Sequence, residues 1–147
     1  MPIKDFERVV RFYEYQNPHG PSMWLPLVGV TLVTPSSNRI DLSLLFDTGA
    51  SFTTLRADLY PILGLHSWDQ GQPTDIATAG GANTVRVYQY DDFRLEVFGK
   101  VIECPIQLAQ MPPNPLFVGL LGRHTIFNEF GFGFWESLHE LYVTANP

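Results

Sequence analysis

The sequence Leu-Leu-Phe-Asp-Thr-Gly-Ala-Ser at residues 44–51 places an aspartate directly after an apolar run. Charged side chains avoid burial unless they are paired or functional, so an apolar strand that ends on a carboxylate suggests a use for it. Thr48 can donate a hydroxyl hydrogen bond inside the turn, and Gly49 permits a close backbone approach or a strained backbone conformation. Asp-Thr-Gly by itself is also common in ordinary turns. A functional Asp47 therefore needs support from the rest of the chain.

Length and composition predict one globular domain. The chain has 147 residues, within the ~100–200 residues of a typical domain. Hydrophobic residues make up 45% and charged residues 16%, which excludes a disordered chain. The aromatic content of 14% favours strands. The net charge is −6 and no basic run occurs, so the sequence lacks the features of a nucleic-acid-binding protein.

Cysteine and histidine usage predicts neither a disulfide nor a metal site. Cys104 is the only cysteine and is expected to be a small core residue. The four histidines are scattered without metal-ligand spacing, so we expect no metal and no cofactor. No apolar run approaches the ~20 residues of a membrane span, and the N-terminus is too charged for a signal peptide. We therefore expect a cytoplasmic protein with no membrane association.

Short strands at even spacing predict an all-β barrel or sandwich. Residues 3–15 fit a helical stripe or a strand equally well, and we favour a strand over 8–15. The other predicted strands are 24–33, 39–46, 53–55, two strands within 76–90 around the glycines at 80 and 81, 93–98, 101–108, 116–123, 132–135 and 141–143. Short helices are predicted over 56–63, with Gly64 as a left-handed stop, and over 124–130. Residues 66–75 and 111–115 are predicted to be loops.

The order of these features resembles a retropepsin-like aspartic protease, the single-lobe family of retroviral proteases and their relatives. The likeness combines the Asp-Thr-Gly-Ala-Ser loop, a glycine-tipped hairpin and Leu-Leu-Gly-Arg at 120–123. It runs from about Trp24 to Val143 and implies an acid protease barrel with one or two short helices and one lobe per chain. It also divides the chain into an N-terminal arm of unassigned role, residues 1–22, and a protease domain, residues 23–147.

The resemblance implies a role for each matching residue. Asp47, with Thr48 and Gly49, would form the catalytic loop, and Thr48 would link the two active-site loops across a dimer axis. Loop support would come from Leu121, Gly122 and Arg123. Substrate would contact the catalytic loop and the tip of a flap, at Ala50, Ser51, Ala79, Gly80, Gly81 and Ala82.

Two positions depart from the family pattern. Retroviral members often carry an acidic residue where Ser51 stands, paired with the arginine that matches Arg123. That ion pair is missing here, so Arg123 needs another partner. His124 stands where many members have Asp or Asn. Both differences concern loop support and the interface, and neither affects the aspartate.

The chemistry of an aspartic protease requires two carboxylates that share one proton and a water. The sequence has only one Asp-Thr-Gly, so a second copy of the chain must supply the other Asp47. This predicts a homodimeric aspartic endopeptidase acting on a peptide or protein. The alternative is a catalytically silent dimer of the same fold that binds a peptide or partner. Candidate pocket walls are Ile76, Val85, Leu116, Phe117 and Val118, although core packing is the more usual role of such residues.

Overall fold

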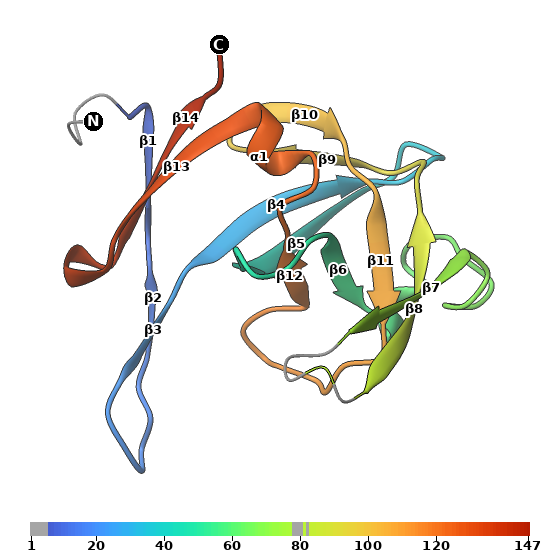
Figure 1. Cartoon of the computed structure of the whole chain (residues 1–147), viewed down its shortest axis with the longest axis horizontal. Coiled ribbons are helices and arrows are strands. Elements are labelled where there is room, and N and C mark those ends of the chain that lie inside the picture. Colours follow the sequence, from blue (N-terminus) through green and yellow to red (C-terminus); the bar gives the residue numbers. More distant parts are fainter. Residues whose placement is uncertain (1–5, 78–80, 82) are drawn as a thin grey trace.

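The computed structural model describes residues 6–77, 81 and 83–147, and in them the chain is all-β, as predicted. Within these residues the strands are interrupted by the 3-10 helices η2 (Ala57–Leu59) and η3 (Glu136–Leu138) and by the α-helix α1 (Ile126–Glu129) (Figure 1). The strands are β1 (Arg8–Arg11), β2 (Tyr13–Tyr15), β3 (Met23–Leu25), β4 (Leu27–Val33), β5 (Arg39–Phe46), β6 (Thr53–Arg56), β7 (Gln72–Ala77), β8 (Thr84–Tyr90), β9 (Arg94–Val97), β10 (Lys100–Glu103), β11 (Ile106–Ala109), β12 (Gly119–Leu121), β13 (Phe130–Trp135) and β14 (Glu140–Ala145). In the described residues, no helix is long and apolar enough to cross a membrane.

Nine strands form one large sheet in the order β10-β9-β4-β5-β12-β6-β11-β8-β7. The hairpin of β4 and β5 was predicted, and the bounds of β5 agree with the predicted 39–46. Most pairs are antiparallel, but β12 is parallel to β5 and antiparallel to β6. The short strand β12 therefore lies between the two strands that flank the Asp-Thr-Gly loop, and this arrangement positions the site.

The large sheet curls around its core. β10 is an edge strand and β11 lies far across the sheet, yet only Cys104 and Pro105 connect them. A chain advances at most ~3.3–3.6 Å per residue, so this link brings the two halves to about the ~10 Å spacing of stacked sheets. The enclosed core contains Leu32, Leu44, Leu55, Phe93, Leu95, Cys104, Ile106, Leu108 and Leu121, each at most 1% exposed. Cys104 is thus a core residue, as predicted.

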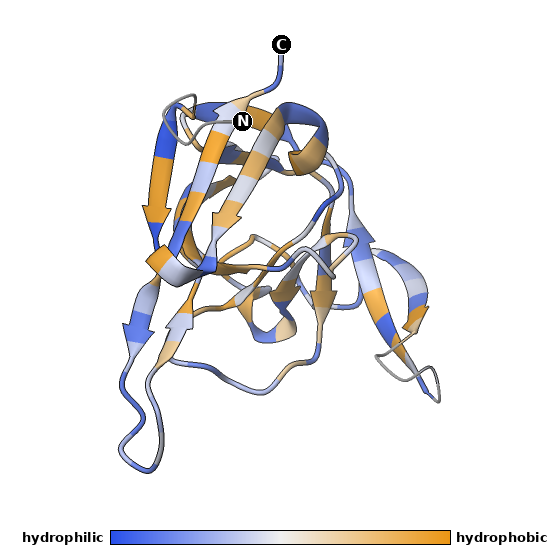
Figure 2. Ribbon diagram, turned by 60° about the vertical axis from the view of Figure 1, so that its left-hand side comes forward, coloured by the Kyte–Doolittle hydropathy of each residue, from blue (hydrophilic) through white to orange (hydrophobic). Residues whose placement is uncertain are grey.

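The two chain ends form a second sheet in the order β1-β14-β13. Its strands show alternating apolar and polar segments when viewed from that side (Figure 2). β2 and β3 continue as a separate two-stranded hairpin, which extends at the lower left of Figure 1, whereas β7 and β8 lie at the lower right. Residues 8–15 are therefore extended, as favoured from the sequence. The strand breaks at Phe12, where the chain exchanges its partner β14 for β3.

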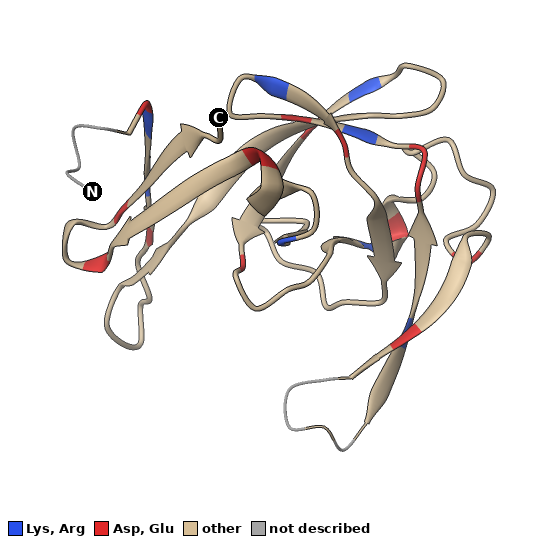
Figure 3. Cartoon of the chain, turned by 45° about the horizontal axis from the view of Figure 1, so that its top comes forward, with Lys and Arg blue, Asp and Glu red and all other residues tan. Residues whose placement is uncertain are grey.

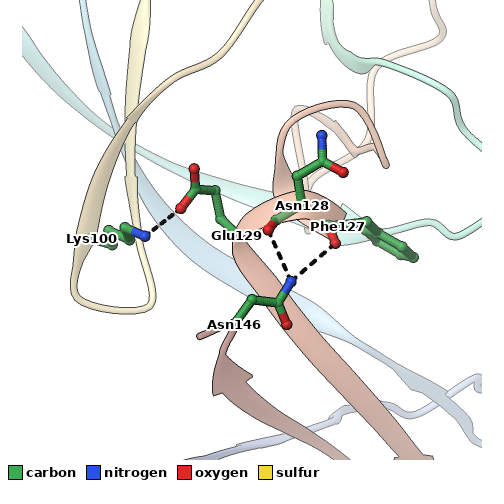
Figure 4. A network of polar contacts seen from close by, with 5 residues as sticks. All are labelled: Lys100, Phe127, Asn128, Glu129 and Asn146. Atoms are coloured by element: carbon green, nitrogen blue, oxygen red, sulfur yellow. Dashed lines mark hydrogen bonds and ion pairs between the residues drawn. The ribbon is translucent and has the colours of Figure 1, made fainter.

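The helix α1 is attached to both sheets by polar contacts (Figure 4). The side chain of Asn146 donates to the backbone carbonyls of Phe127 and Asn128 at 3.4 and 2.9 Å. These carbonyls have no partner inside so short a helix, so Asn146 acts as its C-terminal cap. On the other side, Lys100 of β10 forms an ion pair with Glu129.

Prolines divide two of the predicted strands. The predicted strand 24–33 is β3 and β4, separated by Pro26, and the predicted strand 101–108 is β10 and β11, separated by Pro105. Proline has no backbone N–H to donate to a neighbouring strand. The predicted strand 116–123 is also shorter than expected, because only 119–121 lie between β5 and β6.

The predicted helix over 56–63 is wrong. The chain there forms η2 and a series of turns, although Gly64 does have the expected left-handed conformation, with φ +79°. Pro61 explains the difference, because it removes one helical donor and its ring clashes with the carbonyl four residues earlier. The predicted loop 66–75 is partly wrong as well, since β7 begins at Gln72. Pro73 is tolerated because β7 is an edge strand.

Candidate active site

Asp47 lies where β5 ends beside β12. Its backbone N–H donates to the Leu121 carbonyl at 3.1 Å, which continues the ladder between the two parallel strands by one bond. The loop then turns back on itself. The Gly49 N–H donates to Asp47 Oδ1 at 2.9 Å, and the Ala50 N–H donates to the Asp47 carbonyl at 3.2 Å. These bonds fix the half-buried carboxylate of Asp47 at the surface of a cleft.

The segment after β12 supports the loop from behind. The N–H groups of Arg123 and His124 donate to the carbonyls of Ala50 and Ser51 at 2.9 and 2.8 Å. The Gly122 N–H donates to the Thr53 hydroxyl at 3.2 Å. The three residues predicted for loop support thus contact the Asp-Thr-Gly loop or the strand that follows it.

Gly122 has no room for a side chain. A Cβ atom there would lie 2.3 Å from the Phe52 carbonyl carbon and oxygen. Contacts of this kind cannot be relieved by rotating a side chain, because the obstructing atoms belong to the backbone. The close approach between the two segments therefore requires glycine at position 122, which explains the glycine of Leu-Gly-Arg.

Arg123 has an aromatic partner in place of the missing carboxylate. Its guanidinium lies 5.7 Å from the centre of the Phe127 ring, within the range of a cation–π contact. The Phe127 ring in turn stacks against Phe46 at a centroid distance of 5.9 Å. Phe46 directly precedes Asp47, so Arg123 is linked to the Asp-Thr-Gly loop through two rings. Ser51 and Thr48 are exposed on the loop.

The cleft beside Asp47 has a volume of about 400 Å³. Its lining includes the predicted contacts Ala50 and Ser51 and two of the candidate pocket walls, Ile76 and Val85. The other three candidates lie elsewhere. Leu116 and Phe117 line a neighbouring apolar pocket of about 410 Å³, and Val118 lines a further one of about 270 Å³.

The predicted flap tip is described only in part. Ala79, Gly80 and Ala82 lie outside the described residues. Gly81 has φ +69°, a left-handed conformation that glycine adopts without strain. The strands on either side, β7 and β8, form the predicted hairpin.

Two polar residues of the cleft were not singled out from the sequence. Thr54 and Gln107 line the cleft and are only 8% and 2% exposed. The available signal was a glutamine in the otherwise apolar strand Ile-Gln-Leu-Ala at 106–109. Because its neighbours come from distant parts of the chain, the sequence did not show what Gln107 faces.

The curled all-β sheet and its Asp-Thr-Gly loop, supported by Leu-Gly-Arg, define a retropepsin-like, single-lobe aspartic protease domain. A model of the aspartyl protease family matches residues 33–125, well over half of the chain, and the protein therefore belongs to that family. A comparison with curated proteins found no match.

Proposed function

We propose that the protein is a homodimeric aspartic endopeptidase in which two symmetry-related Asp47 carboxylates activate a water. The observation that carries this proposal is the position of Asp47, with its carboxylate on the wall of a cleft of about 400 Å³ and its loop held by β12. One Asp-Thr-Gly supplies half of the required pair. A two-fold axis beside Asp47 would supply the other half.

The reaction needs one proton shared between the two carboxylates. The ionised carboxylate takes a proton from the water as its oxygen attacks the carbonyl carbon, while the protonated one donates to the carbonyl oxygen. The resulting tetrahedral diol then collapses, the C–N bond breaks, and the nitrogen leaves with a proton. Water is consumed and an acid and an amine are released. Because only the singly protonated pair is active, the rate should fall at both acid and alkaline pH.

The exposed apolar surface supports a dimer. Among the described residues, seven of the nine exposed large hydrophobic side chains lie in the terminal segments 9–24 and 134–138. At roughly 150–250 Å² for a large side chain, they expose on the order of 600 Å² together. This approaches the ~800 Å² that each partner buries in a standard interface. One of them, Phe134, lies 5.4 Å from the Phe46 ring, so the surface reaches the catalytic loop.

Substitution of Asp47 tests the proposal. Asp47→Asn should reduce peptide hydrolysis by at least about a thousandfold, because a catalytic pair acts as one unit. Its thermal unfolding should match that of the wild type. Asp41→Asn is the matched control, since Asp41 lies on the same strand and its carboxylate accepts from the Thr31 hydroxyl at 2.8 Å. It should retain activity. Wild-type protein that binds peptides but cleaves none of them would favour the alternative of a catalytically silent binding module.

A further inference from the structure

A row of polar side chains crosses four adjacent strands beside Asp47. Gln107 of β11 lies opposite Thr54 of β6 on one side and opposite Gln89 of β8 on the other. Gln89 in turn lies opposite Gln72 of β7. Directly opposed residues project from the same face of a sheet, so Thr54, Gln107, Gln89 and Gln72 form one polar row. The four strands lie side by side at the lower right of Figure 1.

The inner half of the polar row lies in the active-site cleft. Thr54 and Gln107 line the same cleft as Asp47, together with the apolar Ile76, Val85 and Leu120. Gln107 is only 2% exposed, and burial of an amide costs free energy unless its hydrogen bonds are made. An apolar side chain would fill this position without that cost.

The outer half of the polar row fixes which end of each amide faces the cleft. Asp91 Oδ1 accepts from Gln89 Nε2 at 2.8 Å. A carboxylate accepts hydrogen bonds, so the amide nitrogen of Gln89 must face Asp91 and its oxygen must face Gln107. Gln107 accordingly donates its Nε2 to Gln89 Oε1, at 3.5 Å. The amide oxygen of Gln107 is left as the acceptor on the cleft side.

Thr54, like Gln107, offers a hydrogen-bond acceptor to the cleft. Its hydroxyl donates to the Phe52 carbonyl at 3.1 Å. A hydroxyl has a single proton, so the oxygen of Thr54 can offer only lone pairs to a ligand. Thr54 and Gln107 therefore present two adjacent acceptors in a cleft whose lining also includes the apolar Ile76, Val85 and Leu120. Burial beside apolar side chains costs a charged group more free energy than an uncharged one, so this lining favours an uncharged donor.

We infer, on the basis of the proposed peptidase function, that this wall of the cleft selects a substrate side chain with an uncharged hydrogen-bond donor, a carboxamide or a hydroxyl, close to the scissile bond. Gln107 is the main specificity-determining residue, and Thr54 assists it. An apolar side chain bound there would displace water and leave both acceptors without a partner. Enzymes discriminate strongly against such substrates, because buried polar groups then remain unpaired.

The test is a peptide library with randomised positions around the cleavage site. The wild type should cleave peptides with Asn, Gln, Ser or Thr at one fixed position about tenfold faster than peptides with Leu or Val there, as expected for one to two buried hydrogen bonds. Gln107→Leu should abolish or reverse this preference while peptides with Leu are still cleaved.

Two controls keep the outcome interpretable. Gln72→Leu changes the exposed, outer end of the polar row and should leave the preference unchanged. Thr54→Val, which removes an acceptor but keeps the shape, should weaken the preference and serves if Gln107→Leu does not fold. Apolar selection at every position, or an unchanged preference in both Gln107→Leu and Thr54→Val, would overturn the inference.

A failure of the proposed function is distinguishable from a failure of this inference. Wild-type protein that cleaves no peptide overturns the peptidase function. The same library is then passed over immobilised Asp47→Asn protein, in which Gln107 and Thr54 are intact. Retained peptides enriched in carboxamide or hydroxyl side chains at one position support the polar selection. Retention without that enrichment, or no retention, overturns it.

Discussion

Cys104 shows how completely one residue of this fold can be removed from water. It lies in the two-residue link between β10 and β11 and has no exposed surface. Burial raises the pKa of its thiol to about 11, and the hydrogen bond with the Thr53 side chain opposes this only in part. Thr53 also accepts from the Gly122 N–H, so the buried thiol and the segment that supports the Asp-Thr-Gly loop share a neighbour.

The raised pKa predicts how the stability of the protein depends on pH. Below about pH 9, the ordinary pKa of the thiol, the folded and the unfolded chain both keep the proton. The contribution of the buried, uncharged Cys104 thiol to stability is therefore fully present. Between this pH and about pH 11 the unfolded chain loses the proton and the folded chain keeps it, so unfolding becomes more favourable. Urea denaturation should therefore show that the free energy of unfolding falls between about pH 8 and about pH 10.5. This fall should be larger in the wild type than in Cys104→Ala, by on the order of 2 kcal/mol. Equal losses in the two proteins would contradict the expectation.

At the scale of elements, β13 connects the terminal sheet to the Asp-Thr-Gly loop. Its sequence Phe-Gly-Phe-Gly-Phe-Trp places phenylalanines on one face. The centroid of the Phe132 ring lies 4.8 Å from that of Phe46 and 5.0 Å from that of Phe127. The Phe98 ring, which follows β9, has its centroid 5.8 Å away. Since Phe46 precedes Asp47, the rings of β13 set the position from which the loop begins.

Truncation of Phe132 should affect stability and catalysis together. Phe132→Ala removes the central ring of this group and should lower the free energy of unfolding by roughly 2–3 kcal/mol, less than the ~3–5 kcal/mol of a fully buried phenylalanine. Because the loop loses its backing, kcat should also fall under conditions in which the variant is fully folded. Val101→Ala is the control, since Val101 is 49% exposed on β10, and it should change stability by no more than ~0.5 kcal/mol. An unchanged kcat in folded Phe132→Ala would show that the rings of β13 do not influence the active site.

At the scale of the whole molecule, charged residues are dispersed over the chain, whereas exposed apolar side chains are clustered. Positive and negative segments are interspersed along the ribbon (Figure 3). The ion pair Arg39–Glu96 joins β5 to β9 across β4, and Arg86–Asp75 links the paired strands β8 and β7. The exposed apolar side chains instead concentrate on the terminal strands and the β2–β3 hairpin. A two-stranded hairpin is at best marginally stable alone, so a surface that covers it would add to its stability.

Sedimentation equilibrium tests the proposed dimer. At micromolar concentration the wild type should have about twice the chain mass of 16.6 kDa. Met23→Lys, at a position 51% exposed on the hairpin, should shift the equilibrium towards the monomer and reduce activity in parallel. Ile62→Lys is the matched control, because Ile62 is 53% exposed but lies outside the terminal segments. A strictly monomeric protein under conditions of full activity would exclude a catalytic pair made of two Asp47 residues.

Local signals in the sequence determined the element types and the candidate catalytic residue. Alternating apolar residues gave the hairpin of β4 and β5, with the bounds of β5 at residues 39–46. The contiguous stretch at 44–51 indicated the loop, and Leu-Leu-Gly-Arg indicated its support. These signals could be recognised because turn chemistry and strand periodicity act over a few neighbouring residues. Where a local signal was overlooked, as with Pro61, the predicted element was wrong.

Only the tertiary structure decided which distant strands are neighbours. The insertion of β12 between β5 and β6 is what brings Gly122 against Phe52, and the polar row exists only because β6, β11 and β8 align Thr54, Gln107 and Gln89. The sequence shows that these positions carry Thr and Gln, but it does not show the register in which their strands pair. A shift of one residue in register would move a side chain to the opposite face of the sheet. Register between strands far apart in the chain follows from burial of the whole core. Asp47 could therefore be found from the sequence, whereas the surroundings that would select its substrate could not.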